Sequence, residues 1–376
     1  MIVALVLCVA VAAGAPAGAV GPEHVAAGDR TRWPEPLTSA AAFDRASRAE
    51  ILSFTAALAE TEGLDDSALM TGLGVRKVHG ESLRRWREES GQRLLENFRR
   101  AAAGCATGEP FCGSVTSPAA LRALAAGLDD SLAEAYRAWR DDARAFHRIY
   151  ATEQLRLAAL FPAPTSEILT VSPAERTGFE LADRQFLLTF DDGPTAPGGA
   201  TAATLAMLRR AGVNGVFFVL GEHVQARVFT ESPAEAPNVY AGMCVGSHGF
   251  RHDSHQRLAD WQRSVDDTMA LLRKTFGSVH RPLFRPPYGQ RTLESADALA
   301  ARGLTLVLWN IDSQDWNPKI AAGDVGNRVL SLMLLWRRGI VLFHDVHDKA
   351  QTAVPYLVER TRNAGVGWVD CRRYPA

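Results

Sequence analysis

Two adjacent carboxylates, Asp191 and Asp192, end a short apolar run and precede the turn-forming pair Gly193-Pro194. Neighbouring carboxylates at a strand end could serve one reaction centre, one as a metal ligand and the other as a base. The same four residues also fit an ordinary solvated turn. The rest of the C-terminal half favours the first interpretation, because polar clusters follow other apolar runs there.

Polar side chains follow four further apolar runs of this half. They are Arg285 and Tyr288, Asp312 and Asp315, His344 and Asp345, and, after a shorter run, His248 and His252. In a barrel of parallel strands and helices, the residues just after each strand converge on one face, where active sites lie. The sequence therefore predicts one shared reaction centre.

His248 and His252 are four residues apart, so both imidazoles can face one divalent metal ion from a helical turn or a tight loop. Such a pair also occurs by chance among solvated or core histidines. An aspartate from another strand end would complete a set of two histidines and one carboxylate, and would leave positions for water and substrate. Asp253 and His255 lie nearby and are interpreted as loop residues.

The elements that would position these groups alternate between strands and helices. Apolar runs at 186–190, 215–220, 304–311 and 340–343 alternate with helical stretches at 203–210, 258–276, 295–302 and 325–336. Strand–helix repetition with short loops predicts a parallel sheet, open or closed into a barrel.

The N-terminal half has helical periodicity, from about residue 40 to 160. A segment that opens with Ser117-Pro118 has an N-cap and a proline at the first helical position, and its apolar residues continue at spacings of three and four to Phe146. The aromatic residues of this stripe are interpreted as core. No catalytic group is expected in this half, and residues 161–166 are predicted to be a linker.

Residues 1–19 are almost wholly apolar or small and end in Ala17-Gly18-Ala19, which predicts a secretory signal peptide. No Lys or Arg occurs before Arg30, so the basic region of a signal peptide is missing. A translation start upstream of Met1 and an uncleaved anchor are therefore alternatives.

Export would place the cysteines in an oxidising compartment. Without Cys8, four remain, and a local bridge between Cys105 and Cys112 would leave Cys244 to pair with Cys371. Four free buried thiols are the alternative for a cytosolic protein.

Length and charge set broader limits. The chain has 376 residues, which suggests two domains or one large barrel with an extension. Its net charge of −1 gives no field that would attract nucleic acid or an anionic membrane.

The polar clusters, taken in order, resemble the five motifs of the polysaccharide deacetylases, the NodB-homology or carbohydrate esterase 4 family. The motifs are Thr189-Phe190-Asp191-Asp192-Gly193, His248-Gly249-Phe250-Arg251-His252, Arg285-Pro286-Pro287-Tyr288, Asp312-Ser313-Gln314-Asp315-Trp316 and Leu342-Phe343-His344. The resemblance covers about residues 184–370 and no part of the helical half. At Gly249 the family usually has Ser or Thr, a difference that bears on metal affinity and not on ligand identity.

This resemblance implies a role for each matching residue. Asp192, His248 and His252 would bind a divalent metal, with zinc fitting the set, and Asp191 would be the general base. The Tyr288 backbone N–H would hold the oxyanion, and His344, oriented by Asp315, would protonate the leaving amine. Arg285 would pair with the acidic cluster, and Trp316 and Leu342 would form the apolar wall around the acetyl methyl.

We therefore expect an exported α/β enzyme with a signal peptide (1–19), an all-α helical domain of unknown role (20–165) and a distorted (β/α)-barrel deacetylase domain (166–376). It would remove N-acetyl groups from an acetylated polysaccharide containing N-acetylglucosamine, such as peptidoglycan, chitin or an exopolysaccharide. The expected location is secreted, periplasmic or in the cell envelope, with no nucleic-acid partner and no stable membrane span after signal cleavage. The alternatives are an O-acetyl esterase acting on a xylan-like polymer and an inactive carbohydrate-binding protein. The oligomeric state stays open.

Overall fold

The structure, a computed structural model, describes residues 22, 24–106, 108–129, 132–230 and 238–375. The predicted signal peptide at 1–19 lies outside the described residues. None of the helices in the described ranges combines the length and apolar character needed to cross a membrane.

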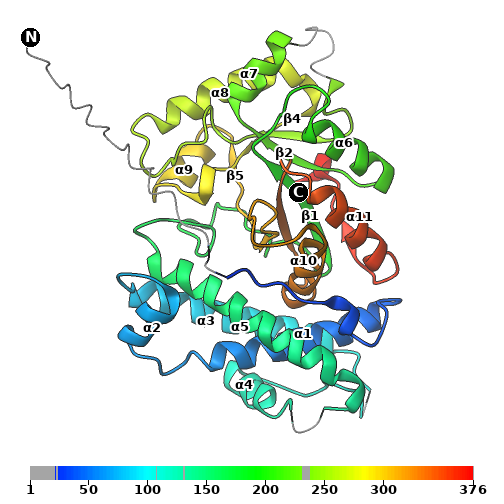
Figure 1. The fold of residues 1–376 in the computed structure, drawn as a ribbon. Helices are drawn as coiled ribbons and strands as arrows, with labels where there is room; N and C mark the ends of the chain where they lie inside the picture. Colours follow the sequence, from blue (N-terminus) through cyan, green and yellow to red (C-terminus); the bar gives the residue numbers. More distant parts are fainter. Residues whose placement is uncertain (1–21, 23, 107, 130–131, 231–237, 376) are drawn as a thin grey trace, which may run out of the picture.

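Helices come first along the chain, and strands alternating with helices follow (Figure 1). The N-terminal helices are α1 (Ala40–Ala59), α2 (Asp66–Leu73), α3 (Gly80–Ala102), α4 (Pro118–Ala126) and α5 (Arg137–Leu160). The second half contains β1 (Gln185–Asp191), α6 (Ala200–Ala211), β2 (Gly215–Val219), α7 (Gly221–Thr230), β3 (Cys244–Ser247), α8 (Trp261–Phe276), β4 (His280–Phe284), α9 (Ser295–Ala300), β5 (Thr305–Leu306), β6 (Ile311–Asp312), α10 (Ala322–Trp336), β7 (Gly339–His344), α11 (Ala350–Thr361) and β8 (Gly367–Trp368).

The strands form one parallel sheet in the order β5-β4-β3-β2-β1-β7-β6, with β8 beside the start of β1. The central strands are buried along most of their length, as expected for a parallel sheet covered by helices on its outer face. This arrangement confirms the α/β fold class and the distorted (β/α)-barrel.

The predicted single strand at 304–311 is wrong in one respect. It is divided into β5, which pairs with β4 at one edge of the sheet, and β6, which pairs with β7 at the other edge. The residues between them bridge the two edges, since Val307 N–H donates to Phe284 O at 2.8 Å and Asn310 N–H to Ile340 O at 3.4 Å. Because this one short segment pairs with both edges of the sheet, neither β5 nor β6 can reach the length of a full strand, and the barrel is distorted.

The predicted helix that opens at Ser117-Pro118 is shorter than its apolar stripe suggests. It ends at Ala126 with Gly127 as the C-cap, and the stripe resumes in α5 after a short 3₁₀ turn. Glycine and the polar residues that follow it favour a turn over a continuing helix. The aromatic residues of the stripe, among them Trp139 and Phe146, are buried, which confirms that they are core.

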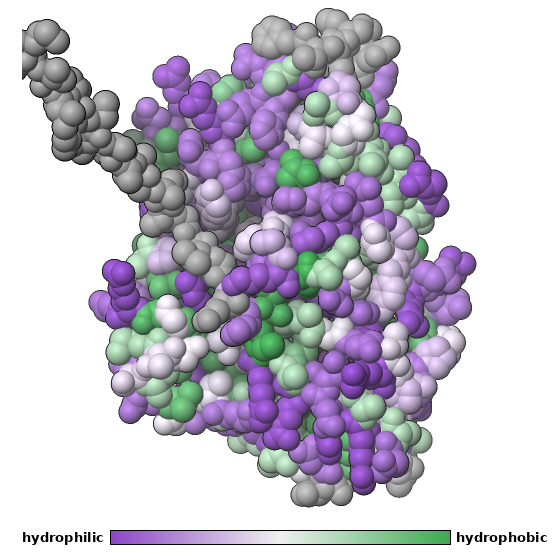
Figure 2. All heavy atoms as spheres, in the orientation of Figure 1, coloured by the Kyte–Doolittle hydropathy of each residue, from purple (hydrophilic) through white to green (hydrophobic). Residues whose placement is uncertain are grey.

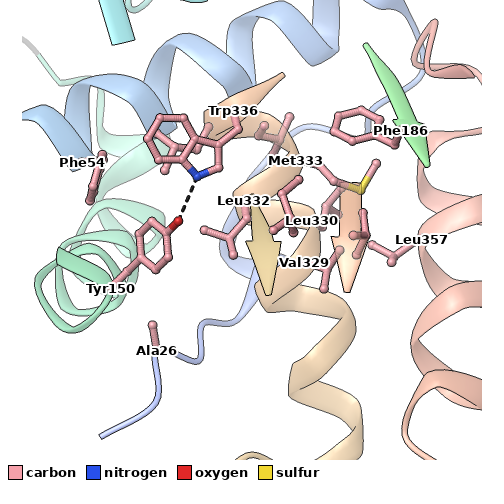
Figure 3. Close-up of a cluster of buried hydrophobic side chains, with 14 of the residues drawn as sticks. Ala26, Phe54, Tyr150, Phe186, Val329, Leu330, Leu332, Met333, Trp336 and Leu357 are labelled. Atoms are coloured by element: carbon pink, nitrogen blue, oxygen red, sulfur yellow. Dashed lines mark hydrogen bonds between the residues drawn. The ribbon is translucent and has the colours of Figure 1, made fainter. Parts of the chain in front are cut away.

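Helix α10 joins the two halves of the molecule. It packs on β6 and β7 on one side and on α1 and α3 on the other, and it is buried along most of its length (Figure 1). Figure 3 shows Trp336 of α10 beside Phe54 of α1 and Tyr150 of α5, and its indole N–H donates to the Tyr150 hydroxyl at 2.9 Å. The two halves therefore share one hydrophobic core.

Polar contacts add to this apolar junction. Ser47 of α1 donates to Leu334 O at 2.6 Å, and Asn97 of α3 donates to Trp336 O at 3.1 Å. The predicted linker also packs on the barrel, because Thr165 is buried and exchanges hydrogen bonds with the Arg291 backbone at 2.8 and 2.9 Å. The domain boundary at 165/166 stays a prediction. The segment before it is packed on the barrel and is not a free tether.

Both predicted disulfides are present. Cys105 is bonded to Cys112 within the helical half, and Cys244 at the start of β3 is bonded to Cys371 near the end of the chain.

Hydrophilic side chains cover most of the face drawn in Figure 2, over both halves. The apolar groups are gathered in the interior and at the junction.

Candidate functional site

The predicted site residues meet at the carboxyl end of the sheet. Asp191 is the last residue of β1 and His344 the last of β7, and the two are directly opposite each other in the parallel register. His248 follows β3 and Arg285 follows β4. Parallel strands bring their carboxyl ends to one side, so Asp191 and His344 lie in one site although they are 153 residues apart in the sequence.

Asp192, His248 and His252 form a group whose ligand atoms all lie within 4.8 Å of one another. The Nε2 atoms of both histidines are 3.4 Å from Asp192 Oδ1. This oxygen is buried and makes no hydrogen bond to any residue that the structure describes. A buried carboxylate oxygen that faces two imidazole nitrogens without bonding them is what a bound cation would satisfy, so these residues fit a divalent metal.

The protonation states of these groups suit metal binding. His248 Nδ1 is 2.8 Å from Arg285 O, which holds the proton on Nδ1 and leaves the Nε2 lone pair for a metal. Burial, and then the charge of His248, lowers the pKa of His252 to about 4. Burial alone would raise the pKa of Asp192, but the nearby histidines hold it below its ordinary value. At neutral pH Asp192 is therefore a carboxylate and His252 a neutral imidazole.

The turn after β1 is constrained by its surroundings. Asp192 has a φ of 78°, in the left-handed region that few residues other than glycine adopt. A Cβ at Gly193 would lie 2.2 Å from Asp345 Oδ2, so only glycine fits there. The Asp-Asp-Gly sequence thus reflects a tight turn that points two successive carboxylates into the site.

Asp191 is held by one cation on one side only. Arg285 Nη1 donates to Asp191 Oδ1 at 2.8 Å, and Arg285 is itself fixed by Leu308 O at 2.9 Å and by stacking on Phe218. Asp191 Oδ2 is 3.8 Å from His248 Nε2. Within the described residues Oδ2 has no hydrogen-bond partner, so it can accept a proton beside the group formed by Asp192, His248 and His252.

His344 is paired with a second carboxylate. Asp315 accepts from the His344 backbone N–H at 2.9 Å and lies 2.8 Å from His344 Nδ1. Burial would lower the pKa of His344, but Asp315 and, more weakly, Asp192 and Asp191 raise it to about 10. The imidazole can therefore carry a proton on Nε2 and release it towards the site.

A cavity of about 360 Å³ opens over these groups. Its lining includes all the predicted metal ligands and Asp191, and also His344, Tyr288, Trp316 and Leu342, whereas Arg285 and Asp315 lie behind the surface groups that they hold. Tyr288 is 46% exposed at the mouth and has a φ of 59°, and its ring packs edge-on to His252. The cavity is in the range that binds small molecules and single sugars.

Gly249 has a structural explanation. Its φ is 87°, and a Cβ there would lie 2.9 Å from His255 Nε2. His255, which we interpreted as a loop residue, is buried and stacked on Phe284 at 5.1 Å. This histidine ring occupies the space beside the loop that carries His248 and His252.

The sequence did not reveal that the helical half contributes to the cavity. Gln154, Arg156, Leu157 and Leu160 of α5 line it, together with Glu167 from the segment after the predicted linker. In the sequence these α5 positions fit an ordinary amphipathic helix, and only the packing of α5 beside the barrel turns them towards the site.

Comparison with known proteins agrees with this geometry. Residues 180–307 match the profile of the family described as Polysaccharide deacetylase. Residues 180–307, which run from just before β1 to just after β5, are thus similar to the polysaccharide deacetylase family. The matched segment contains Asp191, Asp192, His248, His252, Arg285 and Tyr288, and it ends before Asp315, Trp316, Leu342 and His344.

Named relatives that match the barrel half differ in the substrates that their names give. The peptidoglycan-N-acetylglucosamine deacetylase PgdA of Listeria monocytogenes is 27% identical over 197 residues, which are 50% of this chain and 38% of that protein. A bifunctional xylanase/xylan deacetylase of Cellvibrio japonicus is 28% identical over 185 residues, 48% of this chain and 26% of that protein. The chain thus spans well under half the length of both relatives.

Among solved structures, a family 4 carbohydrate esterase from Streptomyces lividans in complex with acetate aligns at 28% identity with a TM-score of 0.41. The alignment covers 49% of this chain and 92% of that one.

Proposed function

We propose that the protein is a metal-dependent hydrolase that removes N-acetyl groups from a polysaccharide containing N-acetylglucosamine. The observation that supports this most directly is the Asp192, His248 and His252 group with the carboxylate of Asp191 on one side and the imidazole of His344 on the other. Bound in this group, a divalent metal, Zn²⁺ by its ligand set, would polarise the acetyl carbonyl and activate a water molecule.

The chain's own residues then divide the proton transfers. Asp191 Oδ2 takes a proton from the attacking water, and Arg285 holds the carboxylate in place through its other oxygen. His344 gives a proton to the departing amine nitrogen, while Asp315 fixes its ring. The backbone N–H of Tyr288 stabilises the oxyanion, and Trp316 and Leu342 form the wall against the acetyl methyl.

Asp191→Asn tests this mechanism. The amide cannot accept the proton, so we expect acetate release from chitotetraose to fall about 100- to 10,000-fold, the contribution of a general base. Metal content, measured by mass spectrometry of the purified protein, should not change. Asp267→Asn, at an exposed position of α8, is the matched control and should behave as wild type. Near-wild-type turnover in Asp191→Asn would overturn the mechanism.

O-deacetylation of a xylan-like polymer is a second candidate, favoured by the similarity to the Cellvibrio japonicus enzyme. The same water attack cleaves an ester. Acetate release from chitotetraose and from acetylxylan, compared as kcat/KM, distinguishes the two candidates.

We also propose that the protein works outside the cytosol. Two disulfides suit an oxidising compartment, and the residues at 1–19 have the composition of a signal peptide. Mass spectrometry of the protein recovered from its native host would show cleavage after Ala19.

A further inference from the structure

Arg156 is a cation of the helical half that lines the cavity and has no partner among the described residues. It lies in the last two turns of α5, is half-buried, and shares the cavity lining with Asp192 and His344. Among the residues that the structure describes, no carboxylate lies within ion-pair distance of its guanidinium and no acceptor bonds to it. Burial accordingly lowers the pKa of Arg156, and no neighbouring charge acts in the other direction.

Two acidic residues that line the same cavity, Glu153 and Glu167, form no ion pair with Arg156 in the described part of the chain. Glu153, three residues earlier on α5, binds Arg328 Nη2 at 2.6 Å through one oxygen and the Ala26 N–H at 2.7 Å through the other. Glu167 lines the same cavity, but burial and the charge of Asp312 raise its pKa to about 7. Neither group neutralises Arg156.

Four arginines that are more deeply buried than Arg156 are each paired with a carboxylate. Arg285 binds Asp191, Arg291 binds Glu175, Arg328 binds Glu153, and Arg337 binds Asp183 and Asp44. A cation partly withdrawn from water without such a partner costs the fold free energy, and an anion that enters the cavity would recover it.

We propose that Arg156 binds a carboxylate of the substrate, carried on a sugar next to the one whose acetyl group reaches Asp191. The inference rests on the proposed deacetylase function and extends it to a substrate class, the acidic glycans. A guanidinium presents two parallel N–H groups that match the two oxygens of a carboxylate. One unpaired cation suits one negative charge, whereas a doubly charged phosphate would call for more.

The surroundings of Arg156 suit a sugar polymer. Leu157 and Leu160 on the same helix, and Trp316 elsewhere in the lining, offer apolar surface to sugar rings, and Gln154 offers an amide to hydroxyl groups. The helical half thus forms one wall of the substrate site, and in this proposal it selects the polymer while the barrel cleaves it.

The test compares two tetrasaccharides that differ in charge. Chitotetraose is neutral, and a tetrasaccharide of alternating N-acetylglucosamine and N-acetylmuramic acid carries carboxylates on its lactyl groups. Acetate release by the full chain is measured as separate kcat and KM values for wild type, Arg156→Gln, Arg156→Lys and the control Arg148→Gln. Arg148 lies on the same helix but pairs with Glu60 at the surface.

We expect Arg156→Gln to raise KM for the acidic tetrasaccharide on the order of 10- to 100-fold, the range for a charge-assisted hydrogen bond, with little change in kcat. Chitotetraose should be cleaved within about twofold of wild type by the same estimate. Arg156→Lys should recover part of the loss, and Arg148→Gln should lose nothing. Equal effects of Arg156→Gln on both substrates, or no effect on either, would overturn the proposal.

Binding separates this proposal from the proposed function. Calorimetry with the Asp191→Asn protein measures affinity for both tetrasaccharides without turnover, in the presence and absence of the Arg156→Gln change. Arg156-dependent preference for the acidic tetrasaccharide supports the proposal even if wild type releases no acetate, an outcome that would overturn only the deacetylase function. Equal affinity for the two tetrasaccharides would overturn the Arg156 proposal. Acetate release from chitotetraose would still support the deacetylase function.

Discussion

The helical half and the barrel half both bury carboxylates, but they treat them differently. In the helical half, Glu50 binds Arg30 and lies 2.9 Å from Trp139 Nε1 and 2.7 Å from His147 Nε2. At the strand ends of the barrel, Asp192 Oδ1 is buried with no hydrogen bond within the described residues. A buried carboxylate whose oxygens are bonded within the protein belongs to the fold, whereas a buried carboxylate oxygen without a partner indicates a position that binds a ligand.

Removing the carboxylate of Asp192 should have the largest effect on function and the least on stability. In Asp192→Ala the two histidines lose the third ligand, so we expect acetate release to fall below detection and the purified protein to contain no bound metal. The metal-free variant should still fold, because Asp192 Oδ1 makes no hydrogen bond within the described residues, and its circular dichroism spectrum should match that of wild type. A variant that keeps its metal would contradict the assignment of Asp192.

Removing a carboxylate whose oxygens are bonded within the protein should do the reverse. Glu153→Gln leaves Arg328, which is 1% exposed, with a buried unpaired charge at the junction of the two halves. We expect a loss of about 3 to 5 kcal/mol in the free energy of unfolding, measured with denaturant. Glu60→Gln is the control, because its exposed pairs with Arg144 and Arg148 should contribute no more than about 1 kcal/mol. Equal losses of unfolding free energy in the two variants would mean that the pair of Glu153 and Arg328 contributes little to the stability of the junction.

The two disulfides sharpen the comparison, since each half has one. Cys244 and Cys371 are 127 residues apart, and Cys105 and Cys112 are seven apart. Loop-closure entropy predicts that replacing both cysteines by alanine costs about 5 kcal/mol for the long loop and about 2.5 kcal/mol for the short one. Denaturant unfolding of both double variants measures the difference, and a larger cost for the short loop would show that residual structure or strain outweighs entropy.

Gly249→Ser should have the smallest effect. The new Cβ would meet His255 Nε2 at 2.9 Å and would sit at a φ of 87°. Displacement of the loop between His248 and His252 should weaken metal affinity about tenfold, as expected for changes next to ligands. A competition titration with a metal-binding dye measures this. His255→Ala in the same background should restore part of the affinity, and tighter binding in Gly249→Ser alone would show that the loop tolerates a side chain.

Much of the barrel could be predicted from the sequence because its signals are local. Apolar runs that end in polar clusters identified the strands and their carboxyl ends, and loop lengths favoured parallel pairing. Asp191 and His344 come into register as a direct result. The cysteine spacing was enough to pair Cys105 with Cys112, because short loops close easily.

The missed features depend on long-range packing. Nothing local in the run at 304–311 shows that it bridges two edges of a sheet, and the periodicity around Arg156 is that of a surface position on any amphipathic helix. The partners Glu153 and Arg328 are 175 residues apart, so their pairing follows from the docking of α5 beside α10. Roles at the site came from the resemblance of the motifs, and the cavity wall contributed by α5 lies outside that resemblance.

Acetate release from chitotetraose by the purified full chain, before and after removal of bound metal with a chelator, tests the central claim most directly. We predict that the metal-free protein is inactive and that one equivalent of Zn²⁺ per chain restores turnover. Undiminished acetate release from protein shown by mass spectrometry to contain no metal would contradict the account.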